Sequence, residues 1–323
     1  MFFQNVKKGG NSPIHYLFTI ILVFLGYFLG YVNLYSIIWL KMNNDNSIGT
    51  ESLKKFAENP DFSLLHIDKN MGFLIILLMF IFALAGLYIG IKFFHKRNFL
   101  SLISYSEKID WKRFLWSTGL WLSMLIIFEL IIYMLEPQNY TFRKPGLSFI
   151  WLIIISILIL PLQTSFEELF VRGYIFQSIA FNTKNIKIGL LSSVLIFAFM
   201  HSGNPEISGY GFFKMMTFYL IAGIVLGLLV VFDDRLELAI GVHTATNIFG
   251  AVFLTYESAA IQTDSLFTTK EIDPLILAFQ FLITGAIFMI IASRKYGWKI
   301  QNIREYFKNI NNNEFKDQDV VDI

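Results

Sequence analysis

The most constraining feature of this sequence is a series of apolar segments that are each long enough to cross a lipid bilayer. A helix needs about 20 apolar residues to cross a hydrocarbon core of about 30 Å. Segments such as 14–40 and 71–94 reach that length with almost no charge inside them. Helices are expected because an open strand would leave its backbone N–H and C=O groups unpaired in lipid. Since 55% of all residues are hydrophobic, the sequence predicts an integral membrane protein.

We predict an all-α fold, a polytopic transmembrane helical bundle of about eight spans. The predicted spans are 14–40, 71–94, 113–135, 148–181, 186–201, 213–232, 236–256 and 274–293. They divide the chain into helices one to three with a polar external loop (1–147), a core of helices four to seven (148–256), a final helix (257–293) and a tail (294–323). We expect the tail to begin as a helix that frays.

The distribution of basic residues between the spans predicts the orientation of the bundle. If the N-terminus is cytoplasmic, that side carries seventeen Lys and Arg residues and the other side carries eight. This difference favours a cytoplasmic location for both termini. Lys7 and Lys8 precede an apolar stretch that is too long for a cleavable signal, so we expect it to be retained as the first span. The Asn-, Ile- and Lys-rich composition suggests a bacterial plasma membrane.

Net charge and cysteine content exclude several classes of function. With a net charge of +2 and no long basic run, the sequence predicts no nucleic-acid partner. The absence of cysteine excludes disulfides, a thiolate zinc site and a cysteine nucleophile. The expected partners are membrane lipid and a peptide or membrane-protein substrate, and the oligomeric state stays open.

Ionisable residues inside the apolar segments indicate a functional site, because each one costs several kcal/mol at membrane depth. The first cluster is Glu167, Glu168 and Arg172. On a helix, Glu168 and Arg172 share a face, whereas Glu167 points about 100° away. We therefore expect Arg172 to hold Glu168 ionised and Glu167 to be free to accept a proton from a bound water. Taken alone, the cluster could equally be the solvated end of a helix.

The second cluster is Phe197 and His201, one helical turn apart in the next span. If the chain turns near residues 182–187, an antiparallel helical pair brings Glu168 and His201 to the same depth. A lone histidine at a helix end is more often structural than catalytic. The second cluster therefore indicates a catalytic role because of its expected position opposite the glutamates.

The third cluster is His243 and Asn247, which lie on one face of the seventh span. Such a pair can be a simple hydrogen-bonding device between helices. Together, however, the three clusters could hydrolyse an acyl bond. A carboxylate beside a histidine can activate water, and a second histidine with an amide can donate hydrogen bonds to an oxyanion.

These residues resemble the CPBP (CAAX protease and bacteriocin-processing) intramembrane proteases, which include the type II CAAX prenyl endopeptidases. The family pattern is Glu-Glu-x-x-x-Arg, Phe-x-x-x-His and His-x-x-x-Asn, each on a separate transmembrane helix. All three motifs occur here in order, within residues 148–256. The resemblance implies an intramembrane endopeptidase that hydrolyses a peptide bond of a membrane-associated or lipidated protein or peptide.

The resemblance also implies three pairs of roles: water activation by Glu167 and His201, oxyanion stabilisation by His243 and Asn247, and support of the site by Glu168 and Arg172. Members of the family have been described both as metalloproteases and as glutamate-dependent enzymes. Glu167, His201 and His243 are the candidate ligands if zinc is present, although the sequence has no His-Glu-x-x-His helix. Zinc therefore stays open, and no other cofactor is expected.

Two alternatives to a protease stay open. The same scaffold could bind a peptide without cutting it, as an immunity protein, or could be a proton-coupled secondary transporter that uses its buried Glu and His. For the protease, we expect water to reach Glu167 through a cavity open to the cytoplasmic side. A turn-rich loop over residues 204–211 could gate substrate access, but a plain connector is favoured. The sequence does not identify the natural substrate.

Overall fold

The computed structural model describes residues 1–299 except 257 and 261, together with Tyr306 and Phe307. Within this part of the chain, six helical segments are long and apolar enough to cross a membrane. They are α1 (Pro13–Asn44), α3 with its continuation (Lys69–Phe94), α4 (Trp111–Leu135), the segment Leu147–Thr183, α10 (Phe212–Asp233) and α12 (Pro274–Tyr296). The prediction of an all-α polytopic helical bundle is confirmed.

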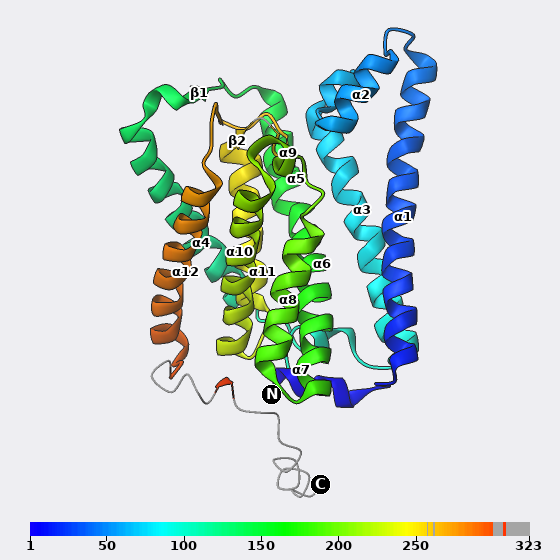
Figure 1. Ribbon diagram of the computed structural model, residues 1–323, viewed down its shortest axis with the longest axis vertical. Helices are drawn as coiled ribbons and strands as arrows, with labels where there is room; N and C mark the ends of the chain where they lie inside the picture. The colour runs from blue at the N-terminus through cyan, green and yellow to red at the C-terminus, as the bar shows by residue number, and fades with distance from the viewer. Residues whose placement is uncertain (257, 261, 300–305, 308–323) are drawn as a thin grey trace, which may run out of the picture.

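Two of the eight predicted spans form helices that are shorter than the six spanning segments. The segment predicted at 186–201 is α8 (Ile186–Met200), an apolar helix of 15 residues. The segment predicted at 236–256 is α11 (Glu237–Ile248), followed by a π-helical turn and the strand β2 (Leu254–Tyr256). Both helices run through the bundle beside longer helices (Figure 1). Since α11 packs against α4, α6 and α10, it is enclosed by protein and has no need to match the thickness of the bilayer.

The segment Leu147–Thr183 is not the continuous helix that the sequence predicts. It consists of α5 (Leu147–Leu158), α6 (Leu160–Glu168), the π-helix η6 (Leu169–Phe176) and α7 (Gln177–Thr183). Pro161 in the first turn of α6 explains the break, because proline lacks the N–H that would continue the hydrogen bonds of α5. The π-helix begins immediately after Glu168, and such wide turns are frequent at functional sites.

The N-terminus and the end of α12 lie at the same end of the bundle (Figure 1). The backbone N–H of Phe2 donates to Asp234 at 2.9 Å, and the indole N–H of Trp298 donates to the neighbouring Asp233 at 3.1 Å. This arrangement agrees with the prediction that both termini share one side, while the assignment of that side to the cytoplasm stays a prediction. The predicted tail helix falls mainly on residues 300–305 and 308–323, which lie outside the described residues.

Short elements that the sequence did not reveal cover the opposite end of the bundle (Figure 1). They are the helices α2 (Thr50–Glu58) and α9 (Pro205–Tyr210) and the strands β1 (Tyr140–Phe142), β2 and β3 (Phe267–Thr269). In the sheet, β3 lies centrally, antiparallel to β1 and parallel to β2. Strands of three residues are too short to show an alternating pattern in the sequence.

The helices α1 and α3 form a closely packed hairpin at one side of the bundle (Figure 1). A Cβ atom added at Gly26 would lie 2.4 Å from the carbonyl oxygen of Phe82, and one at Gly86 would lie 2.3 Å from that of Leu22. Any larger side chain would therefore push the helices apart. These two glycines thus allow direct contact between the two backbones.

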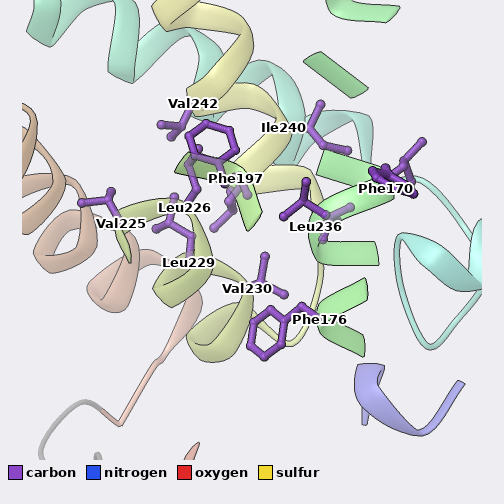
Figure 2. Packing of buried hydrophobic residues seen from close by; sticks show 14 of the residues in the cluster. Phe170, Phe176, Phe197, Val225, Leu226, Leu229, Val230, Leu236, Ile240 and Val242 are labelled. Carbon is purple, nitrogen blue, oxygen red and sulfur yellow. The ribbon is translucent and has the colours of Figure 1, made fainter. Parts of the chain in front are cut away.

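The main hydrophobic cluster lies between η6, α8, α10 and α11. Figure 2 shows Phe176, Phe197, Leu226, Leu229 and Leu236 gathered between these elements. In lipid, apolar helices gain little from the hydrophobic effect, so close packing of such side chains holds the helices together. The cluster thereby fixes the spacing of the three helical segments that carry the predicted motifs.

Candidate functional site

The two adjacent glutamates of α6 have different surroundings, as the sequence predicted. Glu168 is 0% exposed, and its Oε1 atom accepts a hydrogen bond from Arg172 Nη1 at 2.7 Å and lies 2.8 Å from His243 Nδ1. Glu167 is 5% exposed and lines a large cavity. Its Oε2 atom lies 3.3 Å from His243 Nε2. One carboxylate is therefore enclosed by protein, and the other faces the cavity.

Arg172 is fully buried outside the cavity wall and forms an ion pair with Glu168. Its Nη2 atom donates weakly to the Gly223 carbonyl oxygen at 3.5 Å, and its guanidinium lies 4.2 Å from the centroid of the Phe197 ring. Burying an ion pair costs several kcal/mol of desolvation per ion, which close pairing and contact with an aromatic face partly offset. Phe197 of the second motif thus contacts the arginine of the first.

His243 lies between the two carboxylates. Because Glu168 is paired with Arg172, the contact to Glu168 assigns a proton to His243 Nδ1. The contact with Glu167 was not predicted, since the sequence interpretation paired Glu167 with His201. It depends on how α11 packs against α6.

His201 stands at the carboxyl end of α8 and lines the same cavity as Glu167 and His243. Its Nδ1 atom lies 2.8 Å from the Phe197 carbonyl oxygen, which makes Nδ1 the protonated nitrogen and leaves Nε2 as an acceptor. The ring stacks on Tyr219 of α10, with centroids 4.5 Å apart. Tyr219 carried no signal in the sequence because its position beside His201 depends on the packing of α8 against α10.

Polar contacts join α6 to α11 at successive levels. They are Gln163 with Asn247 (3.0 Å), Thr164 with Thr244 (2.7 Å) and Glu168 with His243 (2.8 Å). The sequence interpretation missed Gln163 and Thr164. Gln163 could have been found, because it lies one helical turn before Glu167 in an otherwise apolar stretch. The contacts hold Asn247 at the cavity wall one turn beyond His243.

The cavity has a volume of about 2270 Å³. Four of the six predicted site residues line it: Glu167, His201, His243 and Asn247. Glu168 and Arg172 are absent from its wall and lie behind Glu167 and His243. The structure thus brings Glu167, His201 and His243 to a single cavity, the arrangement on which the sequence interpretation depended.

The position of the cavity corrects one prediction. Its wall includes Glu58, Gln138, Glu206 and Glu271, which belong to connections at the end of the bundle away from the termini. None of the described residues in the connections at the terminal end line it. There the N-terminal helix η1 (Phe2–Lys8) packs against α7 and closes the bundle. With cytoplasmic termini, the cavity opens to the external side, so the prediction of a cytoplasmic opening is wrong for that orientation.

Exposed aromatic side chains border the cavity. Phe24 and Tyr35 of α1 and Phe199 of α8 line its wall and are 64%, 62% and 75% exposed. Since α1 is long and apolar enough to span the membrane, its exposed side chains give the cavity an apolar wall at membrane depth.

The candidate zinc ligands do not form a metal site. Among the described residues, no three His, Asp or Glu side chains are grouped so that they could hold a metal ion. Glu168 engages Nδ1 of His243, and the Phe197 carbonyl engages Nδ1 of His201. These contacts leave Nε2 of both rings free, so the observation against zinc is that Glu167, His201 and His243 are not grouped as three ligands in the described part of the chain.

Comparison with known proteins agrees with the motifs. Residues 146–249 match the family model described as type II CAAX prenyl endopeptidase Rce1-like. The chain is also similar to the uncharacterized protein YyaK of Bacillus subtilis (strain 168), with 27% identity over 290 residues that cover 88% of this chain and 93% of that protein. No solved structure matches the chain. The stretch that holds all six predicted site residues is thus similar to the type II CAAX prenyl endopeptidases, and the resemblance predicted from the three motifs is confirmed.

Proposed function

We propose that this protein is an intramembrane endopeptidase that uses Glu167 to activate water. The observation that carries the proposal is the buried carboxylate of Glu167 at the cavity wall. Its Oε2 atom has no hydrogen-bond partner among the described residues and lies 3.3 Å from His243 Nε2. An ionisable group buried at membrane depth is costly, so this carboxylate, which lines the cavity and is contacted by one imidazole, indicates a site that binds or reacts.

In the proposed reaction, a water molecule donates its two O–H groups to Glu167 Oε2 and His201 Nε2. Glu167 accepts a proton as the water oxygen attacks the carbonyl carbon of the scissile peptide. In this proposal the oxyanion accepts hydrogen bonds from an N–H at His243 Nε2 and from the second N–H of Asn247 Nδ2. Glu167 then returns the proton to the leaving nitrogen, the C–N bond breaks, and a carboxyl and an amino terminus are released.

Glu168 and Arg172 support this chemistry without touching the substrate. Glu168 fixes the proton on His243 Nδ1 and orients the ring, and Arg172 keeps Glu168 ionised. Their complete burial behind the cavity wall supports this division of roles.

The wall of the cavity supports a substrate that is itself attached to the membrane. On α1, aromatic side chains that include Tyr27, Tyr31 and Tyr35 face the cavity. A lipid chain or an apolar helix end could pack against this wall, while the peptide bond reaches Glu167. We therefore propose a membrane-associated or lipidated protein or peptide as the substrate.

A comparison of membrane proteomes tests the proposal. Cells expressing the wild type, Glu167→Gln and the control Glu51→Gln would be analysed for new protein termini. Glu51 is exposed on α2 and lies outside the cavity. We expect cleavage products with the wild type and the control that disappear with Glu167→Gln. If equal amounts of folded wild type and variant give the same termini, the protein does not cleave, and peptide binding without cleavage becomes the better interpretation.

A further inference from the structure

Glu206 is a buried carboxylate that the proposed reaction does not use. It lies on α9, five residues after His201, is 5% exposed and lines the cavity. Its Oε1 atom accepts hydrogen bonds from the backbone N–H of Ala260 at 2.7 Å and from the Tyr256 hydroxyl at 3.5 Å. Its Oε2 atom has no partner, and Glu206 forms no ion pair, among the residues that the structure describes.

The burial of this carboxylate is energetically unfavourable. Burial raises the pKa of Glu206, because the charged form loses water without gaining a positive partner. A carboxylate with a purely structural role would be expected to have both oxygens satisfied or to pair with Lys or Arg. Glu206 therefore has two features of a ligand-binding group, namely burial and an oxygen without a partner among the described residues.

Glu206 lies close to the reaction centre along the wall of the cavity. Asn204, directly before α9, donates from Nδ2 to the Tyr219 hydroxyl at 3.0 Å, and the Tyr219 ring stacks on His201. A chain of direct contacts therefore runs from His201 through Tyr219 to the start of the helix that carries Glu206. A substrate extended from Glu167 toward the mouth of the cavity would pass this helix.

The mouth of the cavity is negatively charged. The acidic side chains along the wall, apart from Glu167, are Glu58, Glu129, Glu136, Glu206, Glu271 and Asp273. Among the described wall residues, Lys270 is the one Lys or Arg. A surface of one sign concentrates ligands of the opposite sign. Gln280 adds a second buried acceptor: it is 4% exposed, lines the same cavity and has an unpartnered Oε1 atom in the described part of the chain.

We propose that Glu206 binds a Lys or Arg side chain of the substrate and thereby selects a membrane-attached peptide with a basic residue near the scissile bond. The ammonium or guanidinium group would supply the hydrogen bonds and the positive charge that Glu206 Oε2 lacks. The apolar part of the same peptide would lie against the aromatic wall of α1. This inference rests on the proposed function for the role of substrate, but binding can be tested without cleavage.

The test measures binding to protein that cannot cleave. Two N-acetylated, fluorescently labelled peptides share a leucine- and alanine-rich segment and differ in one following residue, Lys or Gln. Each is titrated with purified Glu167→Gln in lipid nanodiscs, and affinity is read from fluorescence anisotropy. We expect the Lys peptide to bind at least about tenfold more tightly, in line with a charge-assisted hydrogen bond in a buried site.

Two further variants locate the effect, both made in the Glu167→Gln background. Adding Glu206→Gln keeps an acceptor for Ala260 and should abolish the preference for Lys, whereas adding Glu51→Gln should leave it unchanged. Equal affinity for both peptides, or a preference that survives Glu206→Gln, would overturn the inference.

A third peptide and the cleavage result together keep the outcome decisive. If Glu206→Gln does not fold, a third peptide carrying Glu is measured on protein with Glu206 intact. The order Lys, Gln, Glu in decreasing affinity supports the inference, and any other order contradicts it. A preference for Lys without Glu167-dependent cleavage in cells would refute the proposed function alone. Cleavage that depends on Glu167 without a preference for Lys would refute this inference alone.

Discussion

Two buried polar networks occupy different levels of this bundle, and they differ in whether they border the cavity. The first joins Glu168, Arg172 and His243, and the second is centred on Gln177 near the chain termini. Gln177 is 0% exposed, donates to the backbone oxygens of Phe2 and Ser101 at 3.0 and 3.1 Å, and accepts from Arg97 at 2.9 Å. Only the first network adjoins the cavity.

The network near the termini serves to close the bundle. Asn5 donates to the carbonyl oxygens of Ser101 and Ser104 at 2.7 and 3.0 Å, and His95 contacts the Gly10 carbonyl oxygen and the Tyr174 hydroxyl. Most of these partners are backbone carbonyls, which fold the N-terminal segment onto the following loop. A buried polar network in a membrane protein therefore indicates a functional site when it borders a cavity that a ligand can enter. A network without such access stabilises the fold.

The largest expected difference between the networks is in catalysis. Glu167→Gln should reduce cleavage by about 10²–10⁴-fold, because the amide cannot accept the proton of the attacking water. The unfolding temperature in detergent should change little, since the amide has nearly the same shape. Rates measured on a substrate found by proteomics test this. Near-normal cleavage by folded Glu167→Gln would remove the basis for separating the two networks by function.

The next largest effect is on stability within the first network. Arg172→Leu should destabilise the protein by about 3–5 kcal/mol, because it leaves Glu168 buried without its guanidinium partner. The double variant Glu168→Leu/Arg172→Leu should recover part of this loss. Unfolding free energies of the single and double variants would form a double-mutant cycle. A coupling energy near zero would contradict the idea that Arg172 stabilises this site through Glu168.

A smaller loss of stability is expected in the network near the termini. Asn5→Leu removes two hydrogen bonds to buried carbonyl oxygens and should cost about 1–3 kcal/mol. Cleavage per folded molecule should stay at the wild-type level because Asn5 is not part of the cavity wall. Unfolding and cleavage assays on the same preparation check both statements. A large fall in the rate at unchanged stability would show that the second network also participates in catalysis.

The last expected effect is confined to acidic pH and concerns the stability of the same region. Burial lowers the pKa of His95 from 6.5 to about 4, so the folded state favours the neutral ring. The resulting stability is present above pH 6.5 and is lost as the pH falls through about 4. The unfolding midpoint of the wild type should therefore decrease over this window more than that of His95→Asn. Parallel curves for the two proteins would show that His95 does not titrate in this way.

The sequence predicted the helices and the motif positions well because both depend on local patterns. Runs of apolar residues identify membrane helices, and a four-residue spacing places Glu168 beside Arg172 on any helix. The span at 186–201 was placed correctly, whereas the span at 236–256 was too long, since α11 ends at Ile248 and is enclosed by other helices. Hydropathy measures apolar character and does not distinguish lipid from protein as the surrounding medium.

Contacts across the bundle were harder to predict. The sequence interpretation paired Glu167 with His201, whereas in the structure Glu167 forms its ion-pair contact with Nε2 of His243. It also treated Glu206 as part of a plain connector. Both depend on the rotation and depth of helices that are separated by tens of residues, which spacing along one chain does not specify.

The sequence by itself determined that this protein lives in a membrane as a bundle of helices and that three polar motifs occur in its core, because hydrophobicity and helical spacing act locally. Only the tertiary structure decided which imidazole meets which carboxylate, which end of the bundle is closed, and that Glu206 faces the same cavity as Glu167. These features arise from side-chain packing between distant segments. A small rotation of one helix would change the contacts without changing any local pattern.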